Sequence, residues 1–140
     1  MRGQAIDIKE TVASVDDLYR LYYLKTGSLL EAACLLGYYS ATDNPSVEVE
    51  NDIRTYARAI GIAFQIHDDL LDTKADPSVT GKPVGNDMKN GTKTILSFMG
   101  SDSAEKLEYD LTVSAIEAIT DYADSDGVCQ LAVWLMSRKK

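Results

Sequence analysis

The sequence predicts an all-α fold, and two observations carry this prediction. Apolar residues recur every three or four positions over long stretches, which is the spacing of one face of a helix. Residues that interrupt helices are scarce, because the 140 residues include only three prolines and nine glycines. A chain of this length with 45% hydrophobic residues can form one ordinary core. We therefore expect a single helical domain over residues 1–140.

The first helices are predicted within residues 3–39. The stretch 3–8 is short and is expected to form the last turns of a helix whose beginning is absent. Ser14, followed three residues later by Asp17, is a variant of the capping box and predicts a helix start. Gly27 is expected to loosen or bend this helix. Its apolar positions have helical spacing and are Leu18, Leu21, Tyr22, Leu29, Ala32, Ala33 and Leu36.

The longest predicted helix covers residues 47–72 and is expected to be central. Its apolar residues occupy more than one side, so the helix should be largely buried. These residues are Ile53, Ala57, Ile60, Phe64, Ile66 and Leu70. Residues 73–92 follow as a loop of about twenty residues, which is long for a compact domain and indicates a functional role.

Two or three further helices are predicted after this loop, at about residues 94–99, 104–123 and 127–138. The last of them is expected to dock onto the rest of the domain through four apolar residues. These are Leu131, Val133, Trp134 and Leu135. The sequence shows no internal repeat, low-complexity tract or linker.

The charge of the chain argues against a nucleic-acid or membrane-surface partner. The formal net charge is −8, and such a protein repels phosphate backbones and anionic lipid headgroups. An acidic protein can still bind an anionic substrate when divalent metal ions bridge the two, because the ion inverts the local charge. Small phosphorylated substrates therefore remain compatible with this composition.

The cysteines and the hydropathy pattern indicate a cytoplasmic protein. Only Cys34 and Cys129 are present, and Cys34 lies in an apolar helical run where a thiol behaves as a small hydrophobic group. The first residues lack the apolar core of a signal peptide, and no stretch approaches eighteen consecutive apolar residues. We expect a reduced protein without a membrane span.

Three aspartates at the end of the long helix form the main candidate for a functional site. Asp68 and Asp72 are four residues apart and so lie on one helix face, with Asp69 beside them. Mg²⁺ prefers one or two carboxylates, several waters and substrate phosphate oxygens, which suits a metal bridging to a diphosphate. The simpler alternative is a solvated acidic helix end, because fifteen aspartates make this spacing by chance about a one-in-six event.

Four motifs in order resemble the polyprenyl synthetase family, the trans-isoprenyl diphosphate synthases. GQAID at residues 3–7 resembles a Gly-Gln-x-x-Asp motif, and YYLKTGSLL at residues 22–30 resembles a Lys-Thr helix break. GIAFQIHDDLLD at residues 61–72 resembles Phe-Gln followed by the second aspartate-rich motif. TGKPVGNDMKNGTKT at residues 80–94 resembles a Gly-Lys-x-x-Gly-x-Asp loop. The resemblance implies the C-terminal half of a farnesyl or geranylgeranyl diphosphate synthase-like helical bundle.

The resemblance also implies the reaction. An allylic diphosphate (dimethylallyl, geranyl or farnesyl diphosphate) ionises to a carbocation, isopentenyl diphosphate attacks it, and proton loss gives a chain longer by five carbons. Lys25 and Lys82 are then expected to offset charge on the leaving diphosphate. The Thr26 hydroxyl and the Gln65 amide are expected to present oxygens to the allylic cation.

The remaining site residues are also implied by the resemblance. Asp68 is expected to bind Mg²⁺ directly, and Asp69 and Asp72 to bind it directly or through water. Three further residues are expected to line the diphosphate site, and these are Gln4, Asp7 and Lys93. Thr92 stands where the family usually has a lysine, so Lys93 would have to reach the diphosphate from one residue further on, a rotation of about 100° on a helix. His67 is interpreted as structural.

The chain lacks the family's first aspartate-rich motif and the arginine pair that follows it. We therefore expect little activity from this chain alone, and association as a homodimer or hetero-oligomer because a half bundle leaves apolar faces uncovered. Two alternatives stay open: a non-catalytic or regulatory subunit that pairs with a chain supplying the first motif, and an acidic helical interaction module without affinity for diphosphate. The metal motif of terpene synthases has no convincing copy here.

Overall fold

The computed structural model describes residues 12–74 and 93–139. Their regular elements are all helices, which confirms the predicted fold class for this part of the chain. They are α2 (Val15–Tyr22), η1 (Tyr23–Gly27), α3 (Ser28–Ala41), α4 (Val47–Lys74), α7 (Ile95–Met99), α8 (Ser101–Ile119) and α9 (Asp126–Ser137). The predicted helix at residues 3–8 lies outside the described residues. No helix of the described ranges is long and apolar enough to cross a membrane.

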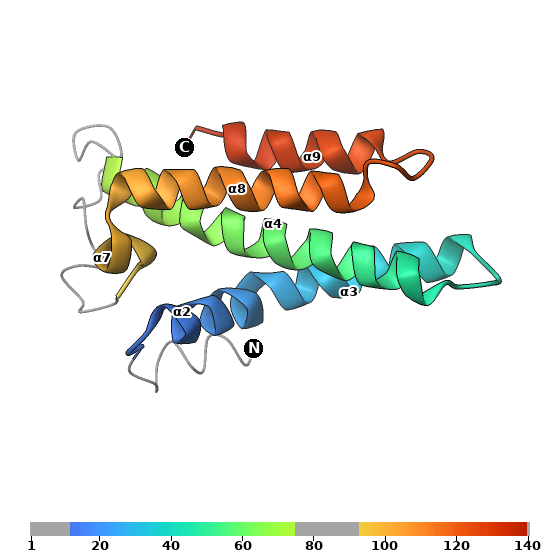
Figure 1. Ribbon diagram of the computed structural model, residues 1–140, viewed down its shortest axis with the longest axis horizontal. Coiled ribbons are helices and arrows are strands. Elements are labelled where there is room, and N and C mark those ends of the chain that lie inside the picture. The colour runs from blue at the N-terminus through green and yellow to red at the C-terminus, as the bar shows by residue number, and fades with distance from the viewer. Residues whose placement is uncertain (1–11, 75–92, 140) are drawn as a thin grey trace.

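Helix α4 is the central element, as predicted. It spans 28 residues, or about 42 Å at 1.5 Å per residue. Figure 1 shows α8 and α9 on one side of it and α2 and α3 on the other. The end of α4 lies near α7 and near the end of α9, whereas the turn between α3 and α4 lies at the opposite end of the molecule. Residues far apart in sequence therefore meet at the end of α4.

Two apolar clusters hold these helices together, and α4 contributes to both. The first joins α2, α4, α7 and α8, and its buried residues are Leu18, Leu21, Tyr22, Ile66, Leu70, Ile95 and Ala104. The second joins α4, α8 and α9, and its buried residues are Tyr56, Ala57, Ala59, Ile60, Ala115, Ile119 and Ala132. Because apolar residues occupy both sides of α4, this helix can serve both clusters.

The start of α2 confirms the predicted capping box. The Ser14 hydroxyl accepts a hydrogen bond from the Asp17 backbone N–H at 3.1 Å, and the Asp17 carboxylate accepts one from the Ser14 backbone N–H at 3.0 Å. Two backbone donors that have no partner within the helix are thereby satisfied.

The predicted bend at Gly27 takes the form of a π-helical turn over Tyr23–Gly27. A π turn holds more residues than an α turn, so it shifts which residues face the core beyond it. The buried residues of α3 are consequently Glu31 and Leu35. Leu29 and Leu36, which the simple helical spacing placed on the same face as Leu18, are 74% and 67% exposed.

Helix α9 docks differently from the prediction. Of the four residues expected at its contact face, Leu131, Val133 and Trp134 are 46%, 56% and 62% exposed. The helix docks through the fully buried Ala132 and through Leu135, which packs against the second cluster. A small residue at the contact lets α9 approach closely, and its bulkier neighbours then lie on the outer face.

Candidate functional site

The three aspartates lie on the last two turns of α4, where the helix approaches α7 and the end of α9. The Asp68 side chain is 40% exposed, and Asp72 is exposed. Within the described residues, no three histidine, cysteine or acidic side chains are grouped closely enough to enclose a metal ion. The aspartates therefore offer an open set of oxygen ligands and no closed protein cage.

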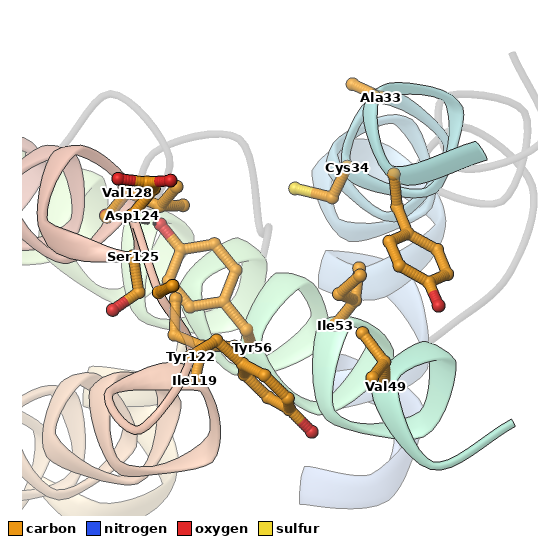
Figure 2. Close-up of a pocket in the computed structure, with 13 residues that line it drawn as sticks. Ala33, Cys34, Val49, Ile53, Tyr56, Ile119, Tyr122, Asp124, Ser125 and Val128 are labelled. Atoms are coloured by element: carbon orange, nitrogen blue, oxygen red, sulfur yellow. Dashed lines mark hydrogen bonds between the residues drawn. The ribbon is translucent and has the colours of Figure 1, made fainter. Parts of the chain in front are cut away.

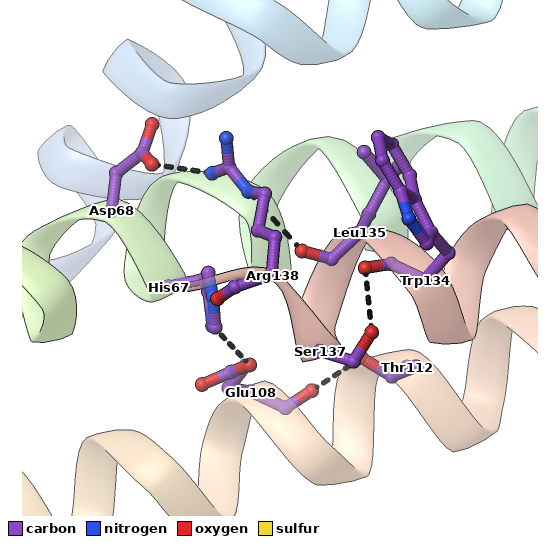
Figure 3. A network of polar contacts seen from close by, with 8 residues as sticks. All are labelled: His67, Asp68, Glu108, Thr112, Trp134, Leu135, Ser137 and Arg138. Carbon is purple, nitrogen blue, oxygen red and sulfur yellow. Dashed lines mark hydrogen bonds and ion pairs between the residues drawn. The ribbon is translucent and has the colours of Figure 1, made fainter. Parts of the chain in front are cut away.

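Asp68 forms an ion pair with Arg138, the residue that follows α9 (Figure 3). The guanidinium group also lies over the Phe64 ring, 4.0 Å from its centroid, and its Nε donates to the Leu135 carbonyl at 3.2 Å. An arginine can satisfy a carboxylate and stack on an aromatic ring at once because its charged group is planar. A fixed cation thus opposes the unfavourable position of a carboxylate at a helix C-terminus.

His67 joins the same network from the neighbouring position on α4. Its Nδ1 lies 2.9 Å from Glu108 Oε1, and its Nε2 lies 3.1 Å from the Arg138 carbonyl oxygen (Figure 3). The residue is only 8% exposed, and its side chain connects α4 to α8 and to the residue after α9. These contacts agree with the structural interpretation of His67. His67 and Glu108 also line a cavity of about 610 Å³, together with Leu70, Glu105 and Val133.

Asp69 faces a different partner. Its carboxylate accepts a hydrogen bond from the Tyr22 hydroxyl of α2, and the Ile95 backbone N–H of α7 lies 3.4 Å from the same oxygen. The Tyr22 oxygen in turn accepts from the Ile95 N–H at 3.2 Å. Tyr22 was interpreted from sequence as an apolar position, because helical spacing cannot reveal a hydroxyl partner on another element.

Lys25 and Thr26 lie on the π-helical turn, where Lys25 is exposed and Thr26 half-buried. The turn lies unusually close to α4: a Cβ at Gly61 would lie 2.4 Å from the Gly27 Cα. A glycine is therefore needed at position 61, where the two backbones meet, whereas a Cβ on Gly27 would meet the Tyr23 ring at 2.9 Å. Departures from α-helical geometry of this kind are frequent at functional sites.

A buried acidic residue, Glu31, forms hydrogen bonds with the π-helical turn and with α4. Glu31 is 5% exposed and accepts hydrogen bonds from Arg58 Nε at 2.8 Å, from the Tyr23 hydroxyl at 2.9 Å and from Arg54. The Arg58 hydrogen bond, helped by Tyr23 and Arg54, lowers the pKa of Glu31 to about 2 against the opposing effect of burial. Regular helical spacing does not predict this cluster, because the π turn determines that Glu31 faces inward.

The other predicted residues are placed as follows. Gln65 is buried on α4, 8% exposed and three residues before Asp68. Lys93 is exposed just before α7, with its Nζ 5.7 Å from the Phe98 ring centroid. Gln4, Asp7 and Lys82 lie outside the described residues, so their predicted roles stay predictions.

The donor set of the aspartate cluster fits Mg²⁺. All three side chains supply hard carboxylate oxygens; Asp72 is exposed, and Asp68 and Asp69 are partly exposed. Mg²⁺ needs only one or two protein carboxylates when waters and phosphate oxygens complete its shell, so an open arrangement suits it. Asp68 and Asp72 would hold such an ion, with Arg138 competing for Asp68.

A further cavity of about 570 Å³ lies toward the other end of α4 (Figure 2). Its walls are mainly apolar and include Cys34, Ile53 and Tyr56. The Tyr56 hydroxyl donates to the Val128 carbonyl at 2.8 Å, and a hydrogen bond to Asp52 raises the pKa of Tyr122 to about 12. Burial also raises the pKa of Tyr56. Among the described residues that line this cavity, none is a lysine or an arginine.

Comparison with known proteins agrees with the motifs. The polyprenyl synthetase family profile matches residues 1–128. Farnesyl diphosphate synthase of Haemophilus influenzae is 32% identical and aligns with 98% of this chain and 47% of its own length. Farnesyl diphosphate synthase of Escherichia coli is 34% identical, with coverages of 99% and 48%. Geranylfarnesyl diphosphate synthase of Aeropyrum pernix is 42% identical, with coverages of 76% and 34%.

A solved structure gives the same result for the fold. A provisionally assigned farnesyl-diphosphate synthase from Marinomonas sp. MED121 superposes with a TM-score of 0.77 at 28% identity, over 97% of this chain and 46% of that chain. The chain thus spans at most about half the length of the relatives it matches. Because the family profile covers most of the sequence and the helices superpose, the chain belongs to the polyprenyl synthetase family.

Proposed function

We propose that this chain is the diphosphate-activating half of a trans-prenyltransferase of isoprenoid biosynthesis. The observation that supports it most directly is the open pair of carboxylates, Asp68 and Asp72, at the end of α4, the helix that the π-helical turn carrying Lys25 approaches at Gly61. Its relatives are named as farnesyl and geranylfarnesyl diphosphate synthases. The proposed substrates are an allylic diphosphate (dimethylallyl, geranyl or farnesyl) and isopentenyl diphosphate.

In the proposed reaction the allylic C–O bond breaks and its electron pair leaves with the diphosphate. When bound, Mg²⁺ neutralises charge on that leaving group. Asp68 and Asp72 would hold the ion with Asp69 beside them, and Lys25, Lys82 and Lys93 would bind the diphosphate oxygens. The isopentenyl double bond then supplies the electrons of the new C–C bond, and a proton leaves the adjacent carbon.

Thr26 and Gln65 are proposed to face the allylic cation. Both carry a neutral oxygen that can stabilise positive charge through its dipole without being a strong nucleophile. Gln65 is buried and three residues before Asp68 on α4, so the two lie on neighbouring positions of one helix face. Gln4 and Asp7 are proposed to complete the diphosphate end of the site.

We propose that the chain has little activity alone, because the sequence lacks the first aspartate-rich motif. A second candidate follows from the same observation: a non-catalytic or regulatory subunit that pairs with a chain supplying that motif. The exposed apolar residues of α3 and α9 favour association with another chain, either a second copy or a different one. We expect a cytoplasmic oligomer.

Calorimetry with pyrophosphate and Mg²⁺ tests the diphosphate site directly. We expect binding that requires Mg²⁺ and that falls at least tenfold when Asp68 and Asp72 are both replaced by asparagine. The double variant Asp43→Asn/Asp121→Asn, which removes an equal charge at two exposed positions outside the cluster, is the control and should bind like the wild type. An interaction module without a diphosphate site would show no Mg²⁺-dependent binding in any of these proteins.

A mass-spectrometric assay separates the two candidates. Allylic and isopentenyl diphosphates are incubated with this chain, with and without a chain that carries the first aspartate-rich motif. Product formed only by the pair, and lost with Asp68→Asn and Asp72→Asn, identifies a catalytic half. Product formation that is unchanged by these substitutions identifies a regulatory subunit.

A further inference from the structure

We propose that Tyr22 is a positioning residue of the diphosphate site, where its hydroxyl fixes Asp69 and the first residue of α7 to each other. The inference rests on the proposed function, because it assigns a role to a residue next to the aspartate cluster. None of the four sequence motifs assigns a polar role to Tyr22. Its position is identified by the contacts it makes with α4 and α7.

The contact joins three helices at one point. Tyr22 ends α2, Asp69 lies on the penultimate turn of α4, and Ile95 begins α7. The hydroxyl donates to Asp69 Oδ2 and accepts from the Ile95 N–H at 3.2 Å, while the same N–H lies 3.4 Å from Asp69 Oδ2. A hydroxyl suits this place because it can donate and accept at once.

The buried surroundings of these three groups favour one hydrogen-bonded arrangement over others. Tyr22 is 5% exposed and Ile95 is fully buried, and both belong to the first apolar cluster with Ile66 and Leu70. In such surroundings a donor or acceptor left without its partner is penalised more heavily than in water. The three groups therefore favour one relative placement of α2, α4 and α7.

That placement matters for the cationic side of the site. Lys93 precedes Ile95 by two residues, so the position of Ile95 relative to Asp69 also sets the position of the Lys93 backbone relative to the aspartates. Tyr22 itself is too deeply buried to touch a diphosphate, and for that reason we assign it a positioning role and no catalytic one.

Tyr22→Phe tests the assignment because it removes the hydroxyl and leaves the ring. Tyr56→Phe is a matched control: Tyr56 is 4% exposed, and its hydroxyl bonds to the Val128 carbonyl beside the apolar cavity. Both variants should lose similar stability. Two readouts are compared at a temperature well below unfolding: amide hydrogen exchange of residues 93–99, and affinity for pyrophosphate with Mg²⁺ by calorimetry.

We expect Tyr22→Phe to speed exchange of the Ile95 amide and to weaken Mg²⁺-pyrophosphate binding, each by about threefold to tenfold, as loss of one typical hydrogen bond predicts. Tyr56→Phe should change neither. Asp69→Asn, which keeps an acceptor for both donors, should preserve slow exchange at Ile95. Unchanged exchange in Tyr22→Phe overturns the contact, and unchanged affinity overturns the positioning role. Failure of the proposed function looks different, because the wild-type chain itself would then bind no Mg²⁺-pyrophosphate.

Discussion

Arg138 and Asp68 form an ion pair although 70 residues separate them in the sequence. The pair connects the residue after α9 to the carboxylate that is proposed to bind Mg²⁺. A guanidinium and a metal ion cannot both occupy the same carboxylate oxygen, so the two compete for Asp68.

Arg138→Ala is therefore expected to raise the affinity of the cluster for a divalent cation. Removing a partly exposed ion pair should strengthen binding by about threefold to tenfold. Mn²⁺ binding followed by electron paramagnetic resonance measures this without substrate or turnover. Lys106→Ala removes an equal charge from the exposed pair with Asp110 on α8 and should leave Mn²⁺ affinity unchanged. Weaker Mn²⁺ binding in Arg138→Ala would contradict the competition.

Glu31 is expected to make the free energy of unfolding depend on pH in the acidic range. Its pKa is lowered from 4.5 to about 2, so its ionised form stabilises the fold above pH 4.5, and this contribution is lost as the pH falls from about 4.5 to about 2. The contribution is at most about 3 kcal/mol and is reduced by solvent around the half-exposed Arg58.

Urea unfolding at a series of pH values tests this expectation. Glu31→Gln should flatten the dependence of the unfolding free energy on pH below 4.5. Glu117→Gln, an exposed position on α8, should retain the wild-type dependence. An unaltered pH profile in Glu31→Gln would show that the Arg58 hydrogen bonds contribute no net stability.

The sequence predicted much of the fold because helical periodicity and end signals are local. The capping box at Ser14 and the long central helix that carries Asp68 and Asp72 follow from neighbouring residues alone. One feature of the fold did not follow. The π turn changes which residues of α3 are buried, and a fixed spacing of 3.6 residues cannot anticipate that shift.

The residues that pair with Asp68 and Asp69 could not be predicted from the sequence either. Arg138 and Tyr22 meet Asp68 and Asp69 only because α9 and α2 pack on the same end of α4. The spacing of these residues in the sequence does not indicate that they are in contact. The motif therefore predicted a candidate site, while the packing of helices determined which groups surround each carboxylate.

Gly61→Ala is expected to disturb both stability and the candidate site. Its Cβ would lie 2.4 Å from the Gly27 Cα and 3.0 Å from the Gly27 nitrogen, so the π-helical turn with Lys25 must move away from α4. Overpacking of this kind destabilises by roughly 1–3 kcal/mol. Gly37→Ala is the control, because a Cβ there meets nothing within 4 Å and should stabilise α3 by up to about 1 kcal/mol. Thermal unfolding with equal melting temperatures for both variants would refute the close contact.

The outer face of α9 is expected to drive association between chains. Val133 and Trp134 are 56% and 62% exposed, and adjacent apolar side chains of this size favour burial against a partner. Replacing both with glutamine should weaken self-association at least tenfold, since each large apolar side chain contributes about 1.5–3 kcal/mol when fully buried. Sedimentation velocity over a range of concentrations measures this shift. Val47→Gln, at a residue 73% exposed at the start of α4, should sediment like the wild type. A wild-type chain that sediments as a monomer at all concentrations would remove the basis for this interface.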